Sequence, residues 1–172
     1  MRRFSVRDLT LAAAIAAVYA VLTLVLPVPA YMGVQFRVAE ALTVLPFLFP
    51  AAIPGLAIGC FLANLLGSPM VVDWIFGTLA TLIAAVWTSK IKNRWLAPLP
   101  PVLCNAVIVG AEIAWFFPEG MAFWSAYALN AFTVGLGELL ACYVLGELLL
   151  EALPRISFFK PFLRQTAQAP SL

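Results

Sequence analysis

The chain has 172 residues, of which 64% are hydrophobic and only 10% are charged. A soluble globular protein carries about 25% charged residues, so the composition excludes a water-soluble domain and indicates surroundings of lipid. The sequence contains no histidine, which excludes imidazole metal ligands and histidine-based acid–base chemistry.

Six helices are predicted within one membrane domain that covers residues 1–172. A membrane span needs roughly 20 mainly apolar residues, and no charge lies between Asp8 and Arg37 or between Glu40 and Asp73. Prolines and glycines separate the apolar runs, so we expect the helices at 9–26, 38–50, 54–67, 73–90, 99–117 and 121–152. The second and third are short, and two crossings there are an expectation from the combined length of 38–67. A basic tail, 153–172, follows.

The basic residues predict the orientation of these helices. If the N-terminus is cytoplasmic and the helices alternate, nine of the ten lysines and arginines lie on the cytoplasmic side, and only Arg37 lies outside. The positive-inside rule describes this bias. We therefore expect an all-α integral membrane protein with both termini inside, whereas five helices would place one basic cluster on the wrong side.

The first predicted helix carries small residues at intervals of four, a pattern that lets another helix approach closely. Two explanations remain open, which are packing within the chain and docking to a partner membrane subunit. The residues concerned are Ala12, Ala13, Ala16, Ala17 and Ala20. Three cysteines lie in three different predicted helices without metal-ligand spacing, so we expect them to pack and predict no metal site.

Polar groups inside the predicted spans are candidates for function, because an ionised side chain costs about 2.5–3.5 kcal/mol there. At a rise of about 1.5 Å per residue, most of them lie in the outer half of the membrane, and five helices contribute. They are Glu40, Asp73, Glu112 and Glu138, with the amides Asn64, Asn105 and Asn130.

Arg37 precedes Glu40 by three residues, and the two can pair on one helical face. Two roles are open for such a salt bridge. It could do no more than neutralise both charges, or it could form part of a ligand site. Aromatic residues gather at the same depth, among them Trp74, Trp115 and Trp124. They fit an interfacial aromatic belt or the wall of an outward-facing pocket with few polar groups.

Catalytic motifs are missing from the sequence. It contains no GxxxxGK[ST] phosphate-binding loop, and no GxSxG or HExxH motif. We therefore expect no enzyme, and any ATP hydrolysis that drives transport would come from separate subunits.

Several segments resemble the QueT family in the same order along the chain. They are RVAEALTVLP at 37–46, PAAIPG at 50–55, GCFLANLLG at 59–67, DWIFGTLATLIAA at 73–85 and NAFTVGLGELLACYVLG at 130–146. Members of this family are substrate-binding S components of energy-coupling factor (ECF) transporters of the bacterial cell membrane, associated with queuosine precursors. The likeness covers most of the chain and is densest from 37 to 85.

The resemblance implies six helices and an outer ligand pocket that is closed by the loop at 27–36. It also implies an ECF module of two cytosolic ATPases and a transmembrane coupling subunit, which grips the alanine face of the first helix, and no cofactor. For a 7-deazaguanine ligand such as preQ1 or preQ0, we expect Glu40, Glu112 and Glu138 as the leading carboxylate contacts, and Asp73 next. Asn64, Asn105 and Asn130 would contact ring heteroatoms, and Trp74, Trp115 and Trp124 would stack on the ring.

Three alternatives remain. The chain could be an S component for another vitamin-like molecule, or a structural membrane protein whose buried acids serve only packing. An intramembrane enzyme is disfavoured because histidine and nucleophile motifs are missing.

Overall fold

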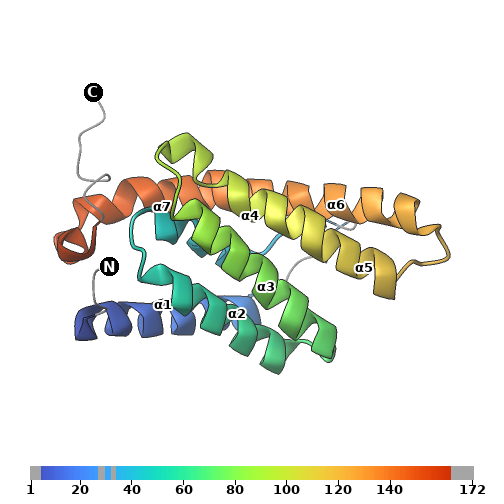
Figure 1. Ribbon diagram of the computed structural model, residues 1–172, viewed down its shortest axis with the longest axis horizontal. Helices are drawn as coiled ribbons and strands as arrows, with labels where there is room; N and C mark the ends of the chain where they lie inside the picture. Colours follow the sequence, from blue (N-terminus) through green and yellow to red (C-terminus); the bar gives the residue numbers. More distant parts are fainter. Residues whose placement is uncertain (1–4, 27–29, 32–33, 164–172) are drawn as a thin grey trace.

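A computed structural model describes residues 5–26, 30–31 and 34–163 of the chain. They form an elongated bundle of helices, in which the start of the first helix and the end of the last one lie at the same end (Figure 1). Three of its helices are α1 (Val6–Val25), α2 (Ala52–Gly67) and α3 (Val71–Thr88), and α2 packs between the other two. The helical class predicted from the apolar runs is thereby confirmed.

Two further long helices each contain a π-helical segment. The first runs through α4 (Leu99–Cys104), η3 (Asn105–Val109) and α5 (Gly110–Phe116), and the second through α6 (Phe123–Leu140), η4 (Ala141–Gly146) and α7 (Glu147–Ala152). Short 3-10 helices complete the chain at η2 (Arg94–Leu96), η5 (Leu153–Arg155) and η6 (Lys160–Phe162). The predicted tail is described as far as residue 163, and its remainder lies outside the described residues.

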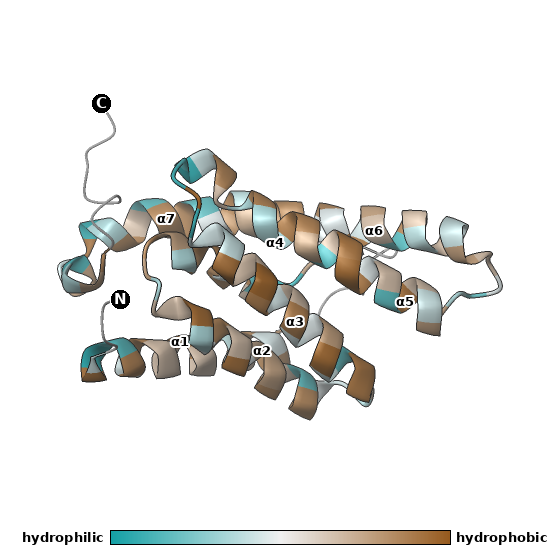
Figure 2. Cartoon of the chain, viewed as in Figure 1, coloured by the Kyte–Doolittle hydropathy of each residue, from teal (hydrophilic) through white to brown (hydrophobic). Residues whose placement is uncertain are grey.

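Four helical stretches of the described chain are long and apolar enough to cross a membrane. They are Val6–Val25, Val71–Thr88, Arg94–Phe116 and Phe123–Arg155. The segments Val38–Phe47 and Ala52–Gly67 are apolar but shorter. Apolar residues dominate the helices (Figure 2), and large ones such as Leu66 (70% exposed) and Phe132 (69% exposed) point outward, as a lipid-facing surface requires.

The segment after Arg37 is a 3-10 helix, η1 (Val38–Phe47), and not the α-helix over 38–50 that the sequence predicted. Two features favour the tighter winding. Pro46 has no N–H to donate, and the Thr43 hydroxyl donates to the Glu40 carbonyl oxygen at 2.6 Å, which competes with α-helical bonding. A 3-10 helix rises about 2.0 Å per residue, so this short element reaches further than an α-helix of equal length.

Two short strands precede η1. β1 (Ala30–Tyr31) and β2 (Val34–Gln35) pair antiparallel, with Ala30 opposite Gln35. They belong to the loop at 27–36 that the resemblance makes a lid, but 27–29 and 32–33 lie outside the described residues.

The predicted alanine face of α1 is divided by its packing on α2. A Cβ added at Gly55 would lie 2.5 Å from the carbonyl oxygen of Ala12, and one at Gly59 would lie 2.8 Å from that of Ala16. Ala12 and Ala16 are therefore buried inside the chain, which corrects the expectation that they dock a partner. The exposed residues of the set are Ala13 and Ala17, while Ala20 is half-buried.

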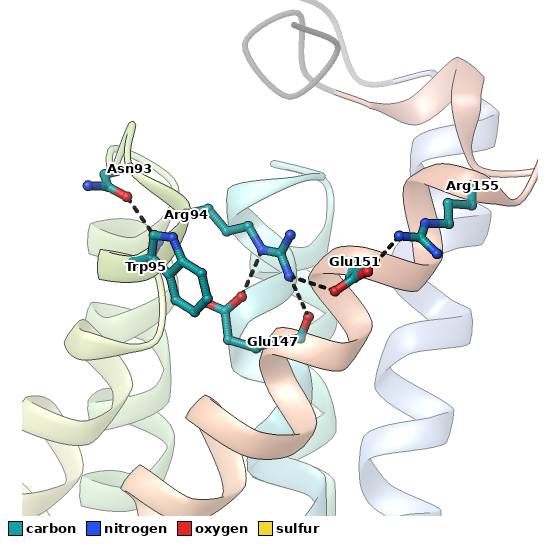
Figure 3. A network of polar contacts seen from close by, with 6 residues as sticks. All are labelled: Asn93, Arg94, Trp95, Glu147, Glu151 and Arg155. Atoms are coloured by element: carbon teal, nitrogen blue, oxygen red, sulfur yellow. Dashed lines mark hydrogen bonds and ion pairs between the residues drawn. The ribbon is translucent and has the colours of Figure 1, made fainter. Parts of the chain in front are cut away.

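A polar network ties η2 to α7 (Figure 3). Arg94 donates from Nε to Glu147 Oε2 at 2.8 Å and from Nη2 to the Glu147 carbonyl oxygen at 3.2 Å. Glu151 lies between Arg94 Nη2, at 3.5 Å, and Arg155 Nη2, at 2.5 Å. The network holds the loop after α3 against the last helix.

Candidate functional site

A small, partly enclosed cavity of about 20 Å³ lies among five elements of the bundle. Each element supplies one or two residues, among them two acids, an arginine and an amide, although apolar atoms make up most of the cavity surface. The lining residues are Arg37, Glu40, Cys60, Gly77, Thr81, Asn105, Val109, Val134 and Glu138. The cavity therefore combines charged and amide groups with a short apolar wall, as a small-molecule site does.

Glu40 is the carboxylate that η1 presents to this cavity, and it is only 2% exposed. The hydroxyl of Tyr19, on α1, donates to Glu40 Oε1 at 2.5 Å. Among the described residues, nothing hydrogen-bonds Glu40 Oε2. A buried carboxylate oxygen without a partner is costly, so this atom is available to accept a hydrogen bond from a ligand.

Glu138 supplies a second buried carboxylate from α6, and Cys142 connects it to Glu40. The Cys142 thiol lies 3.7 Å from Glu138 Oε2 and 3.4 Å from the Glu40 carbonyl oxygen. Cys142 belongs to the π-helical η4, and Asn105 belongs to the π-helical η3. Single-turn π segments are frequent at functional sites, and here both lie beside the cavity.

Arg37 is the cation of the site, although it does not pair directly with Glu40. Its guanidinium interacts electrostatically with Glu40 and Glu138, but no ion pair within 4.0 Å joins it to an acid in the described part of the chain. Arg37 precedes η1 with an extended backbone (φ −101°, ψ 111°). The helical spacing that predicted the pair does not apply there, and Tyr19 takes the bonding position instead.

Three predicted site residues instead build the turn between α2 and α3. Asn64 Nδ2 donates to the Asp73 carbonyl oxygen at 3.0 Å, and the Ser68 hydroxyl donates to Asp73 Oδ2. Trp74 Nε1 donates to the Ser68 carbonyl oxygen at 3.1 Å. These contacts stabilise the start of α3, and none of the three side chains lines the cavity.

Glu112 and Trp115 lie in a separate apolar groove between α3 and α5, together with Phe76, Val107 and Phe123. Glu112 is 7% exposed, and its Oε1 has no hydrogen-bond partner among the described residues. Trp115 is 70% exposed on the surface of the bundle.

The last two predicted site residues lie on α6. Trp124 is 75% exposed and packs edge-on against Phe123 and Tyr127, while Asn130 Nδ2 donates to the Ala126 carbonyl oxygen of its own helix at 2.8 Å. The structure thus keeps all three predicted indoles out of the cavity.

The structure brings together Arg37, Glu40, Asn105 and Glu138 from the predicted set. Sequence reasoning missed Tyr19, although a lone tyrosine within the apolar first helix was a signal that could have found it. The small residues Gly77 and Thr81 carried no such signal. No group of three or more potential metal ligands occurs among the described residues.

Comparison with known proteins identifies a family for most of the chain. Residues 9–155 match the model of the QueT transporter family. No curated protein and no solved structure matches the chain. Since the match covers most of the sequence, the chain belongs to the QueT transporter family of multi-pass membrane proteins, which transport a small molecule.

Proposed function

We propose that this chain is the substrate-binding S component of an ECF importer and that its ligand is a 7-deazaguanine precursor of queuosine. The observation that carries the proposal is the cavity at Arg37, in which Glu40 and Glu138 are both buried and Glu40 Oε2 has no partner among the described residues. Membership in the QueT transporter family supports the transport role.

The chemistry of such a ligand fits these groups. A 7-deazaguanine presents N1–H and a 2-amino group side by side, and one carboxylate can accept from both. Glu40 would serve this purpose, because it is a lining residue of the cavity, its Oε2 has no partner among the described residues, and Tyr19 already holds its Oε1. A purine without the two donors would leave the buried carboxylate unpaired, so the site would reject it strongly.

The cavity favours the aminomethyl form of the ligand over the nitrile. Two acids face one guanidinium, so the ionised site carries one formal negative charge in excess. The ammonium of preQ1 would neutralise that excess, with Glu138 as its partner and Asn105 beside a ring heteroatom. Because no aromatic side chain lines the cavity among the residues that the structure describes, the ring would lie against Val109 and Val134, and not against the tryptophans that the sequence suggested.

The remaining parts of the proposal concern partners and orientation. The chain would work with two cytosolic ATPases and a transmembrane coupling subunit in the bacterial cell membrane, with both termini inside and no catalysis of its own. Ala13 and Ala17, which are exposed on α1, would form the contact with the coupling subunit. The start of α1 and the end of α7 lie at one end of the bundle, which supports placing them on the same side of the membrane (Figure 1).

Calorimetric titration of detergent-purified protein tests the ligand assignment. We expect binding of the aminomethyl 7-deazaguanine, weaker binding of the nitrile, and no binding of guanine or thiamine. Glu40→Gln and Glu138→Gln should each weaken binding at least tenfold, because each removes a charged acceptor from the ligand.

Glu112→Gln is the matched control, since Glu112 is also a buried carboxylate but lies outside the cavity lining. Its affinity should stay within about threefold of the unchanged protein, which corresponds to less than 1 kcal/mol. Binding of thiamine without binding of either deazaguanine would refute the substrate. Equal losses in all three variants would refute the location of the site.

A further inference from the structure

Tyr19 links α1 to the cavity through a single hydrogen bond. Its side chain is 1% exposed, and its hydroxyl donates to Glu40 Oε1 at 2.5 Å. Within the described part of the chain, no other side chain of α1 hydrogen-bonds a residue that lines the cavity. The phenol is therefore the polar contact through which α1 meets the site.

The packing of α1 on α2 fixes where this hydroxyl lies. A Cβ at Gly59 would meet the Ala16 carbonyl oxygen at 2.8 Å and Tyr19 Cβ at 3.0 Å, so the two helices touch directly beside the tyrosine. The neighbouring Cys60 of α2 lines the cavity. A displacement of α1 along α2 would consequently move the Tyr19 hydroxyl relative to Glu40.

The main chain of Glu40 is held by two further contacts. Its backbone carbonyl accepts from the Thr43 hydroxyl at 2.6 Å and from the Cys142 thiol at 3.4 Å. These contacts fix the main chain of η1, but they do not bond the carboxylate itself. The Tyr19 hydroxyl donates to the Glu40 carboxylate, and the Asn105 side chain also interacts with this group.

We propose that Tyr19 is a positioning residue that orients Glu40 toward the ligand and couples occupancy of the cavity to α1. The inference rests on the proposed function and adds a route by which the ligand acts on the helix. Tyr19 occupies Oε1, while Oε2 has no partner among the described residues, so the carboxylate is oriented before the ligand arrives. A ligand that donates to Oε2 acts on the same carboxylate as Tyr19, and linkage is reciprocal, so the position of α1 must in turn alter the ligand affinity.

Tyr19→Phe tests the proposal with little change of shape, because it removes only the hydroxyl. We expect its affinity for the aminomethyl 7-deazaguanine to fall about tenfold, as the loss of a hydrogen bond to a charged group predicts. Tyr143→Phe is the control, because Tyr143 is a partly buried tyrosine of η4 that does not line the cavity. It should bind as the unchanged protein does.

A double-mutant cycle separates positioning from general stability. In the Glu40→Gln background, Tyr19→Phe should reduce the affinity less than twofold further, because the two residues act as a unit. Hydrogen exchange adds a readout for coupling. The ligand should protect the amides of α1 around Tyr19 in the unchanged protein and in Tyr143→Phe, but not in Tyr19→Phe.

Infrared spectroscopy of the ligand-free protein tests the Tyr19–Glu40 contact apart from transport. The carboxyl band that Glu40→Gln removes should shift in Tyr19→Phe and stay in place in Tyr143→Phe. An unshifted band, equal affinity losses in both tyrosine variants, or unchanged protection of α1 in Tyr19→Phe would overturn the proposal. If the band shifts but no deazaguanine binds the unchanged protein, the proposed function fails while the contact between Tyr19 and Glu40 stands.

Discussion

The network around Glu147 allows a sharp test of how burial sets the strength of an ion pair. Arg94→Gln removes the charged partner of a carboxylate whose side chain is 10% exposed, together with a hydrogen bond to the Glu147 carbonyl. Arg155→Gln removes an arginine from the same network where the two side chains are 74% and 49% exposed. The two substitutions are chemically identical and differ in their surroundings (Figure 3).

The expected costs follow from these exposures. Breaking a fully buried pair costs about 3–5 kcal/mol, whereas an exposed pair contributes about 0–1 kcal/mol. Arg94 is itself 37% exposed, so solvent screens part of the interaction, and we expect Arg94→Gln to cost about 2 kcal/mol. For Arg155→Gln we expect at most about 0.5 kcal/mol, and this small loss should vanish in high salt.

Equilibrium unfolding of both variants in mixed micelles, followed by circular dichroism at low and high salt, measures the difference. Arg94→Gln should retain most of its loss in high salt, because the Glu147 carboxylate remains buried without its partner. Equal losses for the two variants, or a loss at Arg94 that disappears in salt, would refute the argument that burial determines the energy.

Other predictions concern packing, docking and the thiols. Gly59→Ala should lower the free energy of unfolding by about 1–2 kcal/mol, because the added Cβ overpacks against the Ala16 carbonyl. Gly135→Ala should lower it by less, because its added Cβ meets only a side-chain methyl at 3.3 Å. A larger loss at Gly135 would contradict the close approach of α1 and α2. Ala17→Trp should abolish co-purification with the ATPase subunits and leave thermal stability intact. Phe132→Trp, on the exposed face of α6, should preserve the complex. An intact complex in Ala17→Trp would show that α1 is not part of the docking surface. Maleimide should label the folded protein slowly and the denatured protein completely, because all three thiols are buried. Mass spectrometry measures the labelling. Rapid labelling of the folded state would contradict the burial of Cys60, Cys104 and Cys142.

Much of the fold follows from local features of the sequence. The apolar runs and the prolines that end them predicted helices at 73–90 and 99–117, and the structure has them at Val71–Thr88 and Leu99–Phe116. Within the site, the cost of a charge in lipid singled out Glu40 and Glu138, and both line the cavity. These inferences succeed because length, hydropathy and charge act on each segment independently of its neighbours.

The same reasoning misplaced residues whose role depends on how a helix is rotated. Glu112 and Trp115 lie at a suitable depth, yet they line a different groove from Glu138. Ala12 and Ala17 belong to one small-residue pattern, but α2 buries the first and leaves the second exposed. Depth in the membrane can be counted along the chain, whereas the direction in which a side chain points depends on the packing partner.

By itself, then, the sequence determined the lipid surroundings, the helical class and the scarce polar groups that a membrane protein can keep only at a cost. The tertiary structure decided which of those groups meet. In the structure Glu40 accepts a hydrogen bond from Tyr19, 21 positions away, because the close packing of α1 on α2 brings the phenol to the carboxylate. The sequence had suggested Arg37 as the partner. Contacts between distant segments depend on helix rotation and close packing, and no local pattern of residues encodes either one.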